Sequence, residues 1–135
     1  MPSLPWRTLH QANPDADYVV MASSLPLKRL RTTFRFFRFT RAIRRQLAGT
    51  EGLIGYTLWA KPLAKRYWTV SVWTDEDALT AFMRASPHAE IMERLHPEMG
   101  ETAFVRWSIK GSEACVTWNE ALSRLATAAE ARAAA

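Results

Sequence analysis

Cysteine is nearly absent from this 135-residue sequence. The single one, Cys115, excludes an intrachain disulfide and any metal site built from several cysteines. No stretch approaches the run of about 18 apolar residues that a membrane-spanning helix requires. Residues 1–9 lack the charged start and apolar segment of a secretory signal, and no glycine-rich phosphate-binding loop occurs. We therefore expect a cytoplasmic protein.

Hydrophobic and aromatic residues, which can form a folded core, are abundant. The residues are 48% hydrophobic, 11% aromatic and 23% charged, and they include six tryptophans. This composition excludes a disordered chain, and the length suits one domain. We predict an extended, proline-containing arm over residues 1–16, a single domain over residues 17–125, and an alanine-rich tail over residues 126–135.

The hydrophobic pattern predicts four strands and three helical regions. The strands are expected at residues 17–23, 53–59, 66–73 and 102–110. A first helix is expected at 27–48, opened by Pro26 and ended by Gly49. A second helical region follows Thr74 and restarts after Ser86, and a capping box at Thr117 predicts a last helix. The order βαββαβ with an added C-terminal helix predicts an α+β, ferredoxin-like fold with an antiparallel sheet.

The expected helix at 27–48 has two unlike faces. Its apolar arc is wider than contact with one sheet requires, so we expect a second element to cover part of it. Arg44 falls inside that arc, and we expect an acid of the second helical region to pair with it in preference to a substrate anion.

Strand 66–73 is apolar or aromatic on both faces. A sheet that is apolar on both faces, with helices on one, requires a cover on the other. We therefore predict a homodimer in which two sheets pack face to face.

Several motifs resemble one known superfamily. The run Tyr67–Trp73 is followed by Thr-Asp-Glu-Asp and then by Ser-Pro-His ending at His88, and this pattern is similar to the antibiotic biosynthesis monooxygenases. Phe-Val-Arg-Trp at 104–107 and Trp-Asn-Glu-Ala-Leu at 118–122 resemble a group of bacterial proteins described as monooxygenase-like or spheroidene-monooxygenase-like. The resemblance implies a dimeric α+β barrel. It also implies a choice among cofactor-free oxygenases, haem-degrading enzymes and members without known activity.

The leading hypothesis is cofactor-independent oxidation of a hydroxylated aromatic or lipophilic molecule. Such a reaction requires a base, a group that stabilises the substrate anion, and an aromatic pocket. We assign the base to His88 and the anion stabiliser to Arg106, and the pocket walls are predicted to be Tyr56, Trp59, Trp68 and Trp107. Each residue also has a structural interpretation: a packed histidine, a rim arginine with an apolar stem, or tryptophans of the core.

Two alternatives stay open. One is a non-catalytic homodimeric binding protein for a hydrophobic ligand or an anionic partner. The other is a haem-binding member that uses His88 or His96, although the Asn-Trp-His combination of the haem-degrading relatives cannot be assembled here. No metal site is predicted.

The positive charge is concentrated in one segment. Residues 18–50 hold eight Lys and Arg and no acid, whereas residues 75–101 hold seven acids. This pattern is typical of a membrane-surface or nucleic-acid-binding helix, but a solvated outer face is favoured because the phenylalanines are needed to cover the sheet. We expect no nucleic-acid partner, and contact with a membrane surface is left open.

Overall fold

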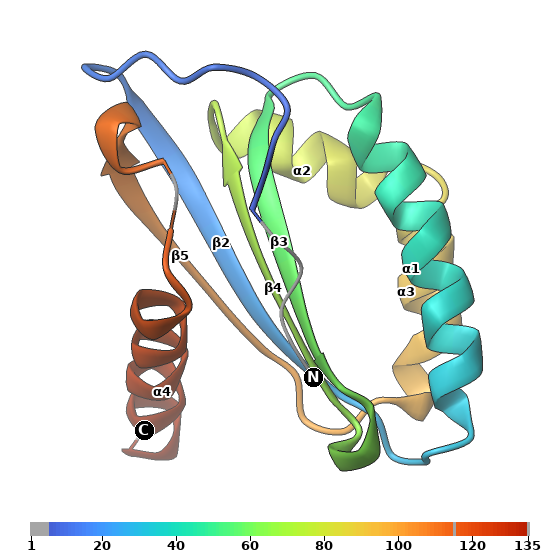
Figure 1. Cartoon of the computed structure of the whole chain (residues 1–135). Helices are drawn as coiled ribbons and strands as arrows, with labels where there is room; N and C mark the ends of the chain where they lie inside the picture. The colour runs from blue at the N-terminus through green and yellow to red at the C-terminus, as the bar shows by residue number, and fades with distance from the viewer. Residues whose placement is uncertain (1–5, 115, 135) are drawn as a thin grey trace.

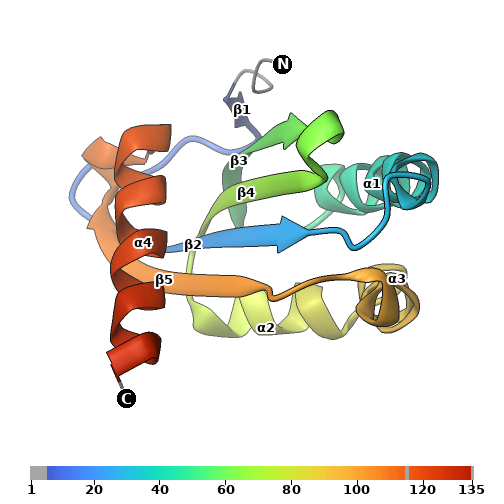
Figure 2. The same ribbon diagram turned by 90° about the horizontal axis from the view of Figure 1, so that it is seen from below.

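The computed structural model describes residues 6–114 and 116–134, so Cys115 lies outside the described residues. A twisted antiparallel sheet forms the middle layer of the molecule (Figure 1). Three helices cover one face of this sheet, and a fourth helix lies on the opposite face (Figure 2). Within the described residues, no helix has the length and apolar character needed to cross a bilayer.

The sheet has the strand order β1-β3-β4-β2-β5, and every pairing is antiparallel. Its strands are β1 (Arg7–Thr8), β2 (Asp17–Pro26), β3 (Leu53–Lys61), β4 (Arg66–Trp73) and β5 (Ala103–Lys110). Without β1 this is the strand order of the ferredoxin-like fold, so the predicted α+β architecture is confirmed. The two-residue β1 adds a short fifth strand against the outer edge of β3.

The longer helices are α1 (Thr32–Ala48), α2 (Glu76–Arg84), α3 (His88–Leu95) and α4 (Trp118–Ala134). Local signals explain two of the starts. The Asp75 side chain accepts a hydrogen bond from the backbone N–H of Ala78 at 2.8 Å, and the Thr117 hydroxyl accepts one from the N–H of Glu120 at 3.2 Å. α4 continues through most of the alanine-rich segment.

The structure corrects the start of the first helix. Pro26 is the last residue of β2, paired with Arg66, and α1 begins only at Thr32. The connection between them is held by backbone bonds, because the N–H of Leu27 donates to the carbonyl of Lys65 at 2.8 Å. The tertiary pairing of β2 therefore outweighs the tendency of proline to open a helix.

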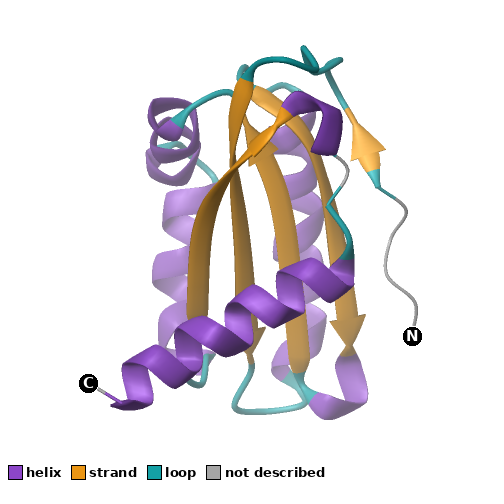
Figure 3. Cartoon of the chain, turned by 90° about the vertical axis from the view of Figure 1, so that its left-hand side faces the viewer, coloured by secondary structure: helices purple, strands orange, loops and turns teal. Residues whose placement is uncertain are grey.

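The face of the sheet opposite α1–α3 is covered within the chain itself. α4 runs diagonally across this face (Figure 3), where Ala121 and Leu125 are buried against Val20, Ala22 and other residues of the sheet. This helix supplies part of the cover that the sequence analysis assigned to a second copy. The homodimer therefore stays a prediction, and the need to cover this face of the sheet is a weaker reason for it.

Candidate active site

A cavity of about 320 Å³ lies between the sheet and helices α1, α2 and α3. This volume falls within the usual range of small-molecule sites. Its lining is predominantly apolar and includes Met21, Leu25 and Leu58 from the sheet and Phe36, Phe39 and Met92 from the helices. The lining also reaches Phe104 of β5, which is partly exposed. The cavity suits a largely hydrophobic molecule.

His88 lies on the cavity wall where three helices meet. Its backbone N–H donates to the side-chain oxygen of Gln46 at 3.0 Å, and the Gln46 amide donates to the carbonyl of Phe82 at 3.3 Å. The His88 ring also packs on the Phe82 ring, with centroids 4.9 Å apart. These contacts fix the start of α3 against α1 and α2, and they hold the imidazole in one place.

The imidazole of His88 is suited to accept a proton. Its Nδ1 lies 3.1 Å from the carbonyl oxygen of Met83, which accepts a hydrogen bond from the Nδ1–H tautomer. Burial lowers the pKa of His88 below its ordinary value of 6.5, and the Met83 carbonyl only partly opposes this effect. At neutral pH the ring is therefore uncharged, with Nε2 carrying the free lone pair.

The cationic group on the cavity wall is Arg44. Its Nε donates a long hydrogen bond of 3.5 Å to the hydroxyl oxygen of Tyr56, a residue whose side chain is almost fully buried. No carboxylate of the described residues lies within ion-pairing distance of Arg44, so the expected acid partner is wrong. Arg44 is a half-buried residue on the wall of an apolar cavity, and its side chain is hydrogen-bonded to the Tyr56 hydroxyl.

Hydroxyl groups add a polar strip along the sheet side of the cavity. The hydroxyls of Ser23 and Thr69 are hydrogen-bonded to each other across β2 and β4, and Ser71 accepts a bond of 2.8 Å from the indole N–H of Trp73. Cavity and polar groups together can bind a flat apolar molecule, remove a proton from it and stabilise the anion.

Residues 34–133 match the model of a family described as a domain of unknown function, DUF3291. The chain belongs to the DUF3291 family. No curated protein matches it.

Solved structures share the fold of this DUF3291 chain. A conserved protein from Methanosarcina mazei Go1 is 16% identical with a TM-score of 0.60, and the match covers 67% of this chain and 90% of the other. An antibiotic biosynthesis monooxygenase is 10% identical with a TM-score of 0.60, over 66% and 95% of the two chains. SnoaB from Streptomyces nogalater, a cofactor-independent oxygenase, is 19% identical with a TM-score of 0.53, over 76% and 98%.

Two further matched chains are longer, and this one covers only 51% and 47% of their lengths. At these identities the likeness shows the fold, which is that of the antibiotic biosynthesis monooxygenases, as the sequence motifs indicated.

The structure brings two of the predicted site residues to the cavity of the DUF3291 chain, Tyr56 and His88. Arg106 is not part of the lining, and its guanidinium is paired with Glu76 at 2.8 Å on the surface. The alternative haem ligand, His96, is exposed and also lies outside the lining.

The other three predicted wall residues, Trp59, Trp68 and Trp107, lie on the opposite face of the sheet, in the layer covered by α4. Trp59 packs on Trp68 and on Trp118 of α4, with ring centroids 5.1 and 5.5 Å apart. Strand alternation distinguishes tryptophans that face the cavity from those that face α4. Trp68 and Trp73 are five residues apart on one strand, so they point to opposite faces of the sheet. The cavity residue that the sequence did not assign to the site is Arg44. Its position as a charged residue inside the apolar arc of the helix is the feature that could have identified it.

Proposed function

We propose that this protein is a cofactor-independent oxygenase that binds a hydroxylated aromatic or similarly lipophilic molecule between the sheet and α1–α3. The observation that carries the proposal is the apolar cavity with a neutral histidine on its wall and an arginine that has no carboxylate partner among the described residues. The fold shared with SnoaB, itself a cofactor-independent oxygenase, supports the same reaction class.

Without a cofactor, the substrate itself must supply every electron that reduces O₂. A phenol with hydrogen on the para carbon loses its hydroxyl proton, and the phenolate transfers an electron to O₂. One oxygen atom becomes bonded to the para carbon and the other leaves as water, so one phenol and one O₂ give one quinone and one water. No external reductant enters this balance.

Three side chains divide this work. Nε2 of His88 accepts the hydroxyl proton, because the Met83 carbonyl holds the other ring nitrogen in its protonated form. Arg44, with the Tyr56 hydroxyl beside it, stabilises the phenolate. Arg44 takes the role first assigned to Arg106, since the Arg106 charge is already neutralised by Glu76 outside the cavity lining.

The homodimer and the cytoplasmic location belong to the same proposal. Sedimentation at micromolar concentration tests the first, and fractionation of the source cells tests the second.

The apolar lining also favours a second candidate, a non-catalytic binding protein for a hydrophobic ligand. The two candidates share the cavity and differ in whether His88 is required.

Oxygen uptake with naphthols and naphthalenediols tests the proposal. For a substrate that is turned over, His88→Gln should lower kcat about 100-fold or more with little change in KM, as expected when a general base is lost. Arg44→Gln should lower kcat/KM by a similar factor through loss of anion stabilisation. Binding of the same molecules is followed by quenching of the fluorescence of Trp73, which lines the cavity.

The matched control is Arg106→Gln, which removes the same charge outside the cavity lining and should leave turnover unchanged. Binding without oxygen uptake in the wild-type protein would establish the second candidate instead. Turnover that survives His88→Gln would refute the assigned base.

A further inference from the structure

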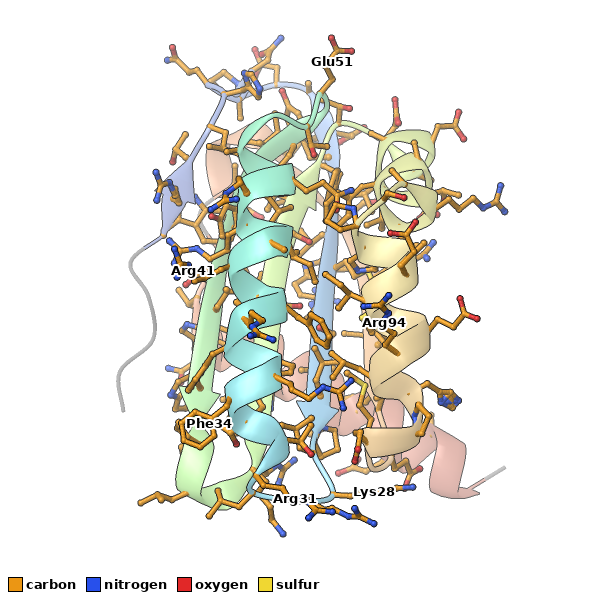
Figure 4. The ribbon with its side chains drawn as sticks, turned by 90° about the vertical axis from the view of Figure 1, so that its right-hand side faces the viewer. Lys28, Arg31, Phe34, Arg41, Glu51 and Arg94 are labelled. Carbon is orange, nitrogen blue, oxygen red and sulfur yellow. The ribbon has the colours of Figure 1, made fainter. Side chains whose placement is uncertain are left out.

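Large apolar side chains are exposed around the start of α1. Phe34 is 82% exposed, Leu30 is 50% exposed, and Leu63, in the turn between β3 and β4, is 89% exposed. The sequence predicted that a second element would cover part of the apolar arc of this helix, and α3 covers it near Phe36 but leaves the start of α1 uncovered. α3 packs along α1, and Phe36 is buried, but Phe34 points to solvent (Figure 4).

Backbone hydrogen bonds bring three segments together at this end of the molecule. The N–H of Leu27 donates to the carbonyl of Lys65 at 2.8 Å, and the N–H of Lys28 donates to the carbonyl of Glu98 at 2.9 Å. We call the surface formed by residues 26–35, 61–66 and 96–101 the basic end. It holds seven Lys and Arg against two Glu.

Most of these positive charges have no acidic partner in the part of the chain that the structure describes. Arg35 lies 3.9 Å from Glu98, at the limit of ion pairing, whereas Lys28, Arg29 and Arg31 have no carboxylate of the described residues within that distance. Lys61 and Arg66 lie over tryptophan rings, 5.0 and 5.2 Å from the ring centroids, which leaves their charge uncancelled. The exposed apolar groups are therefore surrounded by free positive charge.

The other end of the strands carries an acidic run. Register pairs Pro26 with Arg66 at the basic end and Val19 with Trp73 roughly 25 Å away, so residues 75–77 lie at the far end. Glu76 is paired with Arg106 there, whereas Asp75 and Asp77 have no basic partner among the described residues. This separation would orient the molecule in the field of a negatively charged surface, with the basic end leading.

We propose that the basic end docks on anionic phospholipid bilayers, with Phe34, Leu30 and Leu63 entering the headgroup region and the Lys and Arg side chains meeting the phosphates. A membrane accommodates both parts of the patch, because apolar insertion and attraction to anionic lipid act together. Two copies of the chain joined through this patch would bring like charges together. A nucleic acid would neutralise the arginines but leave the aliphatic Leu30 and Leu63 without an apolar environment.

Co-sedimentation with vesicles tests the proposal. The protein should bind vesicles that contain phosphatidylglycerol, should bind vesicles of phosphatidylcholine alone far more weakly, and should be released as the salt concentration rises. Phe34→Ser should weaken the partition coefficient about ten-fold, and each of Lys28→Gln and Arg31→Gln about five-fold. Because these three side chains are exposed, the variants should fold normally.

Arg41→Gln is the matched control. It removes an exposed charge from the same helix, about 15 Å along the axis from Arg31, and Figure 4 shows it well above Lys28 and Arg31. This variant should bind as the wild-type protein does.

Four results would overturn the proposal. One is the absence of binding to phosphatidylglycerol vesicles, and another is equal weakening by Arg41→Gln, which would indicate general charge attraction. The third is tight binding to duplex DNA with no binding to vesicles, and the fourth is a dimer that Phe34→Ser dissociates. Either of the last two would assign the patch to another partner.

Discussion

Acidification below neutral pH should destabilise this protein through His88. Burial lowers the pKa of His88 in the folded state, whereas the unfolded chain has a value near 6.5. Above both values neither state carries the proton, so the free energy of unfolding is unaffected. Between them the unfolded state binds a proton that the folded state excludes, and stability falls as the pH falls.

The size of the effect follows from the linkage of one proton. The slope contributed by His88 approaches at most about 1.4 kcal/mol per pH unit between the folded and unfolded pKa values, and it vanishes below the folded pKa, where both states are protonated. Urea unfolding from about pH 8 to pH 5 measures the total change, which also contains the titration of carboxylates.

His88→Gln isolates the histidine. The difference in unfolding free energy between the wild-type protein and this variant should be constant above about pH 7 and should shift against the wild-type protein on further acidification. Carboxylates and the other two histidines cancel in the difference. Two results would refute the buried neutral histidine. One is parallel plots of unfolding free energy against pH for the two proteins. The other is an NMR titration of the His88 ring with a midpoint at or above its ordinary pKa.

Three further predictions concern packing and charge. Gly111→Ala should lose about 1–3 kcal/mol in urea unfolding, because the new methyl group would stand 1.8 Å from the backbone oxygen of Asn13. Gly49→Ala should change stability far less, because the nearest atom to its methyl group would be 4.0 Å away, and equal losses would contradict this account. Leu79→Ala in the core should cost about 2–5 kcal/mol, whereas Leu63→Ala should stay within about 0.5 kcal/mol because its side chain is exposed. Arg106→Ala removes one exposed ion pair and should change the unfolding free energy by no more than about 1 kcal/mol.

The element order could be predicted because each element carries its own local signal. The alternation of β5 and the acidic start of α2 identify a strand and a helix without tertiary information. The start of α1 could not be found this way. Pro26 suits a helix start as well as a strand end, and the choice depends on partners in β4 that lie forty residues away.

The candidate site was only partly predictable for a similar reason. His88 follows a recognisable Ser-Pro-His motif, and Tyr56 lies on an aromatic strand. Strand alternation places Trp68 and Trp73 on opposite faces of the sheet. Which of the two faces α1–α3 cover depends on tertiary packing. Whether Arg44 has an acidic partner depends on how α2 and α3 are oriented against α1, so its lack of one among the described residues could not be predicted.

The position of β2 has a consequence for how the chain is synthesised and folded. β2 is made early, but its two neighbours in the sheet are β4 and β5, and β5 is completed only at Lys110. A nascent chain that ends before residue 103 would expose one full edge of β2, a hydrogen-bonding surface on which other chains can aggregate. Folding therefore depends on contacts between distant parts of the sequence, which favours slow closure of the sheet after most of the domain has left the ribosome.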